Sequence, residues 1–165
     1  MTAGKKNLSK SNQVPAGNFS KPEGEKDVPV WYFPNSPLGS AVRYIASLSP
    51  NFHWVGIYIL NGNMLELGPF VGEDTPHKKI PVGKGVCGTA VKENRDVNVP
   101  DVKAHENYLA CSLKTRSELV VLVRDLKGKI LGQIDIDSHV ENAFGAHEEK
   151  LIQLVAQQLG ELWPG

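Results

Sequence analysis

The sequence has few cysteines and no excess of charge of either sign. Of its 165 residues only Cys87 and Cys111 are cysteine. Two cysteines are too few for the disulfide framework of a small secreted protein. Basic residues (Lys and Arg) and acidic residues (Asp and Glu) each number 18, so the formal net charge is zero. Because nucleic acids and anionic membrane surfaces attract an excess of basic residues, neither is a predicted partner.

Long apolar runs are also missing. No segment approaches the roughly 20 consecutive apolar residues that a membrane-spanning helix needs. The opening residues, MTAGKKNLSK, lack the apolar centre of a secretory signal peptide. We therefore expect a cytoplasmic protein. In a reducing cytoplasm, paired cysteines are more often catalytic or metal-binding than structural, although both thiols could also be ordinary core residues.

Two regions differ in composition. Residues 1–30 are rich in Lys, Ser, Asn, Gly and Pro without periodicity, which predicts a polar N-terminal arm. Residues 31–165 have the length of one domain, and 41% of the whole chain is apolar, which is enough for a core. We predict a single domain over 31–165.

Within this domain, helical patterns are fewer than strand patterns. Three helices are predicted. The first begins at Ser36–Pro37, the second is short and begins near Gly85, and the last covers 146–163. Strands are predicted over 53–60, 63–70, 96–100, 117–124 and 129–138, with the first hairpin turning at Asn61–Gly62. Hairpins without β-α-β alternation predict an α+β fold, with one antiparallel sheet, helices on one face and a loop-covered ligand pocket on the other.

The first strand predicts one wall of that pocket. Side chains alternate along a strand, so Trp54 and Tyr58 share one face, whereas Val55, Ile57 and Ile59 share the other. The aliphatic face suits packing against helices. The aromatic face suits a pocket wall, with ordinary core packing as the alternative.

Three carboxylates are predicted to converge on the same face. If Lys127–Gly128 is a two-residue hairpin loop, Glu118 lies directly opposite Asp137. Asp135 shares the face of Asp137, because side chains alternate. Such like charges repel one another, and acids among aliphatic side chains indicate a partly closed site with perturbed pKa values. A bound ammonium group would relieve the repulsion. A metal fits less well, because no His or Asn cluster accompanies the acids, and no metal or cofactor is predicted.

The two cysteines suit redox chemistry. Cys87 stands at the start of a predicted helix, where a thiolate is favoured, and Cys111 lies in a polar loop. They could form a transient disulfide if their Cα atoms come within about 7 Å. A zinc site that adds His77 and His105 fits no usual ligand spacing.

Several motifs carry a resemblance to a known family. HWVGIYIL, LELGPF, IPVGKGVCGTA, VPDV and IDIDS, with the run from His105 to Glu118, resemble the GAF-domain free methionine-(R)-sulfoxide reductases. The resemblance implies a GAF/PAS-like fold and free methionine-(R)-sulfoxide as the substrate. It also implies that Glu118, Asp135 and Asp137 bind the substrate ammonium and assist protonation of the sulfoxide oxygen. Trp54 and Tyr58 match positions in the family's pocket wall.

The resemblance implies a thiol mechanism as well. Cys111 matches the family nucleophile, which attacks the sulfoxide sulfur, releases methionine and is left as a sulfenic acid. Cys87 would condense with it to a disulfide, which a thioredoxin-like reductant reduces. The third cysteine found in many members is replaced here by His77, so only Cys87 is left to resolve Cys111.

Other interpretations stay open from the sequence. The N-terminal region differs from the longer helical lead of the family, which leaves a homodimer undecided. A non-catalytic GAF module that binds a small amino-bearing ligand is one alternative function. A redox sensor based on Cys87 and Cys111 is another.

Overall fold

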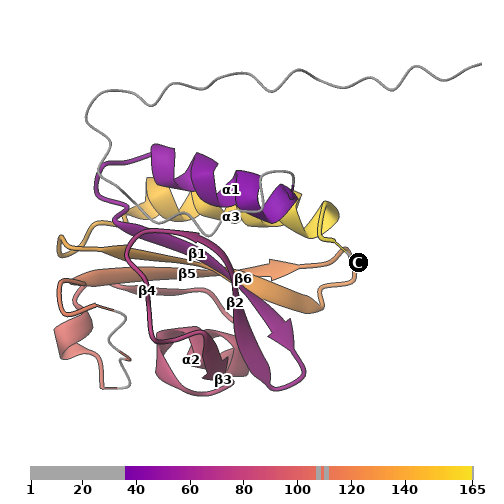
Figure 1. Cartoon of the computed structure of the whole chain (residues 1–165), viewed down its shortest axis with the longest axis horizontal. Helices are drawn as coiled ribbons and strands as arrows, with labels where there is room; N and C mark the ends of the chain where they lie inside the picture. Colours follow the sequence, from indigo (N-terminus) through magenta and orange to yellow (C-terminus); the bar gives the residue numbers. More distant parts are fainter. Residues whose placement is uncertain (1–35, 107–108, 110–111, 165) are drawn as a thin grey trace, which may run out of the picture.

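The structure, a computed structural model, describes residues 36–106, 109 and 112–164. Its centre is a six-stranded antiparallel sheet in the order β3-β2-β1-β6-β5-β4 (Figure 1). The strands are β1 (Trp54–Asn61), β2 (Met64–Val71), β3 (Lys79–Pro81), β4 (Val97–Val99), β5 (Ser117–Arg124) and β6 (Ile130–Ser138). The predicted polar arm and Cys111 lie outside the described residues.

Helices cover both faces of this sheet. Helices α1 (Pro37–Ser47) and α3 (Ala146–Glu161) lie side by side on one face, and α2 (Gly85–Glu93) lies on the other (Figure 1). A short 3-10 helix, η1 (Val102–Ala104), follows β4. Within the described part of the chain, none of the helices has the length and apolar character needed to cross a membrane. The α+β prediction is confirmed, with α2 joining the loops that cover the second face.

The ends and faces of the long helices follow local chemistry. As predicted, Ser36 caps α1, where its hydroxyl accepts a hydrogen bond from the Gly39 N–H at 3.0 Å. Helix α3 buries one narrow stripe. Leu154 is 48% exposed, because only this stripe of the helix meets the sheet and α1.

The two faces of the sheet have separate cores. Val55 and Ile57 of β1 pack with α1 and α3, whereas Trp54 and Tyr58 pack with α2 on the opposite face. The predicted alternation along this strand is therefore confirmed. The face that carries Trp54 and Tyr58 is called the site face below.

The first hairpin turns one residue later than predicted. Asn61 pairs with Met64, so the turn residues are Gly62 and Asn63. Gly62 has φ of +59°, and Asn63 is not in the left-handed region. One positive φ is enough for this turn, and glycine supplies it without steric cost.

The second hairpin has the predicted register but not the predicted turn. Glu118 pairs with Asp137 as expected, and the same register holds through most of β5 and β6. The loop, however, is longer than two residues, because the Asp125 N–H donates to the Lys129 carbonyl at 2.9 Å. An extra residue in β6, Leu131, shifts the pairing by one and restores the register. The longer loop and the extra residue offset each other, so the pairing of Glu118 with Asp137 is the predicted one.

Candidate functional site

Three carboxyl groups lie together on the site face. Glu118 of β5 pairs directly with Asp137 of β6, and Asp135 stands two residues earlier on β6. All three are buried, with exposed fractions of 3%, 2% and 0% in that order. Their convergence follows from the strand period of two and the register of the hairpin, so this part of the sequence prediction is confirmed.

Strand β1 lays an aromatic ring beside these acids. Trp54 pairs with Asp137, and Gly56 pairs with Asp135. A Cβ atom at Gly56 would lie 2.2 Å from Trp54 Cη2, so the indole occupies the space that a side chain at Gly56 would need. Tyr58, the second predicted wall residue, is fully buried, with its ring centroid 6.4 Å from that of Trp54.

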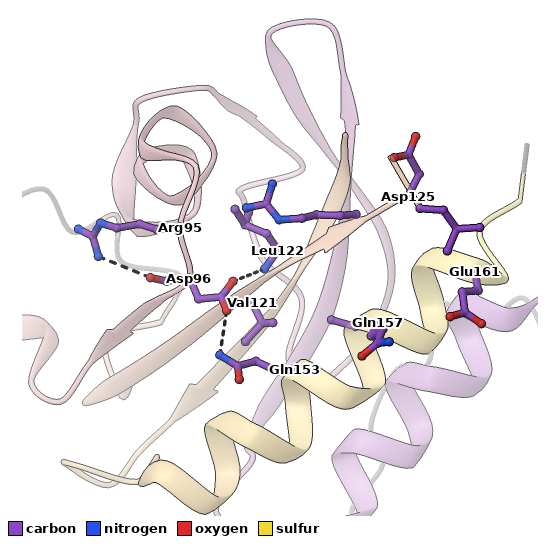
Figure 2. Close-up of a pocket in the computed structure, with 11 residues that line it drawn as sticks. Arg95, Asp96, Val121, Leu122, Asp125, Gln153, Gln157 and Glu161 are labelled. Carbon is purple, nitrogen blue, oxygen red and sulfur yellow. Dashed lines mark hydrogen bonds between the residues drawn. The ribbon is translucent and has the colours of Figure 1, made fainter. Parts of the chain in front are cut away.

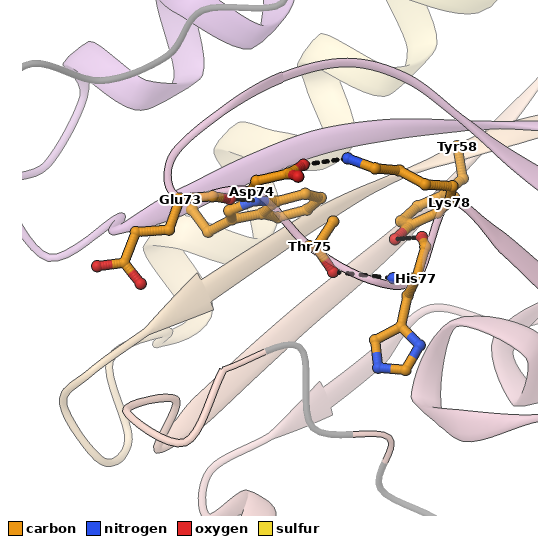
Figure 3. A network of polar contacts seen from close by, with 7 residues as sticks. Tyr58, Glu73, Asp74, Thr75, His77 and Lys78 are labelled. Carbon is orange, nitrogen blue, oxygen red and sulfur yellow. Dashed lines mark hydrogen bonds and ion pairs between the residues drawn. The ribbon is translucent and has the colours of Figure 1, made fainter.

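The loop after β2 is tied to both aromatic side chains (Figure 3). Trp54 Nε1–H donates to the Glu73 carbonyl at 3.1 Å, and the Tyr58 hydroxyl donates to the His77 carbonyl at 2.8 Å. The Thr75 hydroxyl accepts from the His77 N–H at 3.2 Å. The indole N–H and the phenol O–H are thus partnered within the protein, and the Trp54 ring also stacks on Phe70 with centroids 5.6 Å apart.

The first turn of α2 brings a thiol to the acids. Cys87 is the third residue of this helix and is buried. Its thiol donates to Glu118 Oε1 at 3.8 Å. Donor atoms of Cys87, Glu118 and Asp135 all lie within 4.8 Å of one another. The predicted meeting of Cys87 with the acids is therefore present, while the place of Cys111 lies outside the described residues.

Burial and mutual repulsion make these carboxyl groups hard to ionise. Burial, and next the nearby charges of Asp135 and Asp137, raise the pKa of Glu118 well above its usual range. Burial raises the pKa of Asp135 from 3.8 to about 6, against smaller lowering effects of Cys87 and Glu118. Burial and then the charge of Asp135 also raise the pKa of Asp137. Near neutral pH the site therefore holds bound protons as well as negative charge.

Several polar atoms on this face have no hydrogen-bond partner within the part of the chain that the structure describes. Both carboxylate oxygens of Asp135 and Asp137 Oδ1 are in this state. The Cys87 thiol and Glu118 lie close to Asp135, but without hydrogen-bond geometry. None of the ion pairs between described residues involves the three acids. A ligand that brings a positive charge and hydrogen-bond donors would satisfy these atoms.

One buried polar residue of the site face, Gln133, was not predicted from the sequence. Gln133 is fully buried on the site face, opposite Tyr58 and Leu122, and both polar atoms of its amide are unpartnered. The signal was present, because Gln133, Asp135 and Asp137 alternate in the run GQIDIDS. Among the described residues, no polar group forms a hydrogen bond with this amide.

The space beside the thiol is small. A cavity of about 10 Å³ lies there, lined by Ile80, Lys84, Gly85, Val86, Cys87, Leu109 and Glu118. This is room for about one water molecule.

A wider hollow of about 520 Å³ lies elsewhere, between α3 and the end of β5 (Figure 2). Its central acid, Asp96, accepts hydrogen bonds from the Leu122 N–H at 2.9 Å and from Gln153 Nε2 at 3.1 Å. These two contacts satisfy Asp96 and tie the residue before β4 to β5 and α3.

Comparison with known proteins agrees with the geometry. The GAF domain family matches residues 42–162. The free methionine-R-sulfoxide reductase of Escherichia coli is 43% identical over 108 residues, which are 65% of this chain and 64% of that protein. The matched part is thus slightly less than two-thirds of the bacterial relative. The free methionine-R-sulfoxide reductase of Saccharomyces cerevisiae is 37% identical over 81% of this chain and 78% of its own.

A solved structure is also similar. The type II free methionine-R-sulfoxide reductase of Thermoplasma acidophilum superposes with a TM-score of 0.71 and is 41% identical. The superposition covers 73% of this chain and 85% of that one.

Proposed function

This chain belongs to the GAF domain family, and we propose that it reduces free methionine-R-sulfoxide to methionine on the site face. The observation that carries the proposal is the buried group of Glu118, Asp135 and Asp137, which has no cationic partner among the described residues. A free amino acid brings the ammonium group that this site lacks. A methionine sulfoxide residue inside a protein has no such charge.

The acids then have two roles. In their ionised form they hold the substrate ammonium, and the contact offsets the cost of burying negative charge. In their protonated form they donate to the sulfoxide oxygen. The raised pKa values of Glu118 and Asp137 and the pKa of about 6 for Asp135 keep both forms available near neutral pH. Trp54 and Tyr58 enclose the apolar part of the substrate.

The electrons come from thiols. Cys111 attacks the sulfoxide sulfur, the methionine sulfur is reduced, and oxygen remains on Cys111 as a sulfenic acid. The Cys87 thiol condenses with this sulfenic acid, which forms a disulfide and releases water. A thioredoxin-like dithiol then reduces the disulfide and completes the cycle. The position of Cys87 against Glu118 supports its part in this sequence.

Turnover with defined substrates tests the proposal. With dithiothreitol as reductant, we expect methionine from free methionine-R-sulfoxide, but little from the S epimer or from N-acetyl-methionine-R-sulfoxide, which has no ammonium charge. Cys111→Ser should abolish turnover. Cys87→Ser should keep turnover with dithiothreitol and lose it with thioredoxin, because the resolving thiol is gone. Equal rates with the N-acetyl compound, or full activity of Cys111→Ser, would contradict the proposal.

The same assay separates the alternatives. A non-catalytic GAF module would bind the amino acid without forming methionine, and Cys111→Ser would bind it equally well. The cytoplasmic location and a homodimer remain predictions.

A further inference from the structure

Three elements bring a thiol and two carboxylates to one buried point. Cys87 comes from the first turn of α2, Glu118 from β5 and Asp135 from β6. One sulfur or oxygen atom from each lies within 4.8 Å of the other two. All three residues are at most 3% exposed, so solvent does not screen this cluster.

The carboxylates in this cluster are short of partners. Among the described residues, neither oxygen of Asp135 accepts a hydrogen bond, and Glu118 Oε1 accepts a weak one from the Cys87 thiol at 3.8 Å. A buried carboxylate costs several kcal/mol unless it is paired or coordinates a metal. The unpartnered oxygens of Asp135 therefore indicate a site that is built to receive a positively charged group.

The donor set is selective among metals. Zinc binds thiolate sulfur and carboxylate oxygen in a four-coordinate site, whereas Mg²⁺ and Ca²⁺ take oxygen alone. Zinc–sulfur and zinc–oxygen bonds of about 2.3 and 2.1 Å place neighbouring ligands roughly 3.5 Å apart in a tetrahedron. The separation of up to 4.8 Å therefore closes with side-chain movements of about 1 Å. A water molecule completes the four ligands.

We propose that Cys87, Glu118 and Asp135 form a binding site for one Zn²⁺ ion, which reversibly inhibits the protein. Zinc replaces the thiol proton of Cys87 and any proton that Glu118 or Asp135 carries, and these protons are released to solvent. Insofar as the proposed reductase function holds, the ion occupies the place of the substrate ammonium and also blocks the resolving thiol. From the sequence alone, the lack of a His or Asn cluster beside the acids argued against a metal. The structure adds the Cys87 thiol as a further ligand. Among the described residues, the metal-ligating group includes neither His77 nor His105.

Cobalt titration of the full-length chain tests the site without any substrate. In reduced Cys111→Ser, which keeps Cys87 as its only cysteine, one equivalent of Co²⁺ should produce thiolate-to-cobalt absorption. Zinc should displace the cobalt, because it binds such ligands more tightly. Asp135→Asn added to Cys111→Ser should weaken Co²⁺ binding by at least about tenfold, as losses around metal ligands do. Glu66→Gln, at an exposed ion pair with Lys79, is the matched control and should leave binding unchanged.

Two results would overturn the zinc site. The first is absence of the absorption in Cys111→Ser, with circular dichroism showing a folded chain. The second is the same absorption and affinity in Cys87→Ser, which would place the metal on Cys111. If the wild type turns over, zinc should raise KM for the sulfoxide and leave kcat unchanged. Since the titration needs no turnover, failure of the zinc site and failure of the proposed function give different results.

Discussion

Asp135 is the residue at which ligand binding and folding stability conflict most. It is fully buried, has no hydrogen-bond partner, and its pKa is raised from 3.8 to about 6. Its contribution to stability is therefore complete below pH 3.8 and is lost as the pH rises through 6. The shift corresponds to about 3 kcal/mol of unfolding free energy at neutral pH.

We predict that Asp135→Asn stabilises the fold while it damages the site. At pH 7.5 its unfolding free energy should exceed that of the wild type by up to about 3 kcal/mol. Most of this gain should disappear at pH 4, where the native carboxyl is already protonated. Urea denaturation at both pH values measures the effect, with the exposed Glu66→Gln as control. A gain of equal size at both pH values would show that the charge of Asp135 is not its cause.

The same substitution should lower kcat/KM roughly 10- to 100-fold, the equivalent of one charged hydrogen bond. Steady-state rates with free methionine-R-sulfoxide provide the measurement. Unchanged kcat/KM would mean that the substrate ammonium binds elsewhere.

Single residues of the site could largely be predicted from the sequence. Asp135 and Asp137 share a face because the strand period of two leaves no freedom, and Trp54 and Tyr58 follow the same rule. Gln133 obeys this rule too, but it was overlooked because a lone amide carries no charge to draw attention. The pKa shifts could not be predicted in size, because they depend on burial by α2 and its neighbouring loops.

Helix α2 is the element that places the thiol, and its fit against β3 is tight. The Gly83 N–H donates to the Gly88 carbonyl at 2.8 Å, which ties the start of the helix to the preceding turn. A Cβ atom at Gly88 would lie 2.5 Å from the Pro81 carbonyl oxygen. Since backbone cannot yield as a flexible side chain does, any side chain at Gly88 must displace the helix that carries Cys87.

We therefore predict that Gly88→Ala costs about 1–3 kcal/mol of unfolding free energy through overpacking, and also lowers kcat/KM. The matched control is Gly62→Ala, where φ is +59° and no heavy atom lies within 4 Å of the added Cβ. The control should lose about 1–2 kcal/mol to backbone strain and keep its kcat/KM. Equal effects of both substitutions on kcat/KM would show that the position of α2 does not matter for the chemistry.

Elements were predicted better than the turns that join them. The register of β5 against β6 was correct although the loop was not, because the extra residue Leu131 offset the longer turn. Such a compensation cannot be read from a sequence, since a bulge depends on packing rather than on local propensity. Along α3, apolar periodicity gives the direction of the buried face but not its width, so Leu154 is left 48% exposed.

At the scale of the whole molecule, the family match takes in nearly all of the described residues. The family match covers residues 42–162, and Ser36 is the N-cap of α1. The α+β class could be predicted from the sequence. So could the placement of the acids on the sheet face opposite α1 and α3. The small size of the cavity could not, because it depends on how side chains such as Leu109 close over the acids.

We propose that residues 31–165 form a single GAF domain and that the polar arm, 1–30, is not needed for its fold or activity. Deletion of residues 1–30 should leave the melting temperature unchanged and kcat/KM within about twofold of the full chain, since polar termini tolerate truncation. Differential scanning calorimetry and steady-state rates measure both. A large loss of kcat/KM with an unchanged melting temperature would assign the arm to the site, and a large drop in melting temperature would assign it to the fold.

A single turnover without reductant tests the redox chemistry most directly. Reduced protein is freed of dithiol and mixed with excess free methionine-R-sulfoxide, and methionine, titratable thiols and disulfide-linked peptides are then quantified. We predict about one methionine per chain, loss of both thiols and a peptide pair that links Cys87 to Cys111, as expected for a covalent thiol mechanism. Absence of methionine, or methionine formed with both thiols still titratable, would contradict the proposed mechanism.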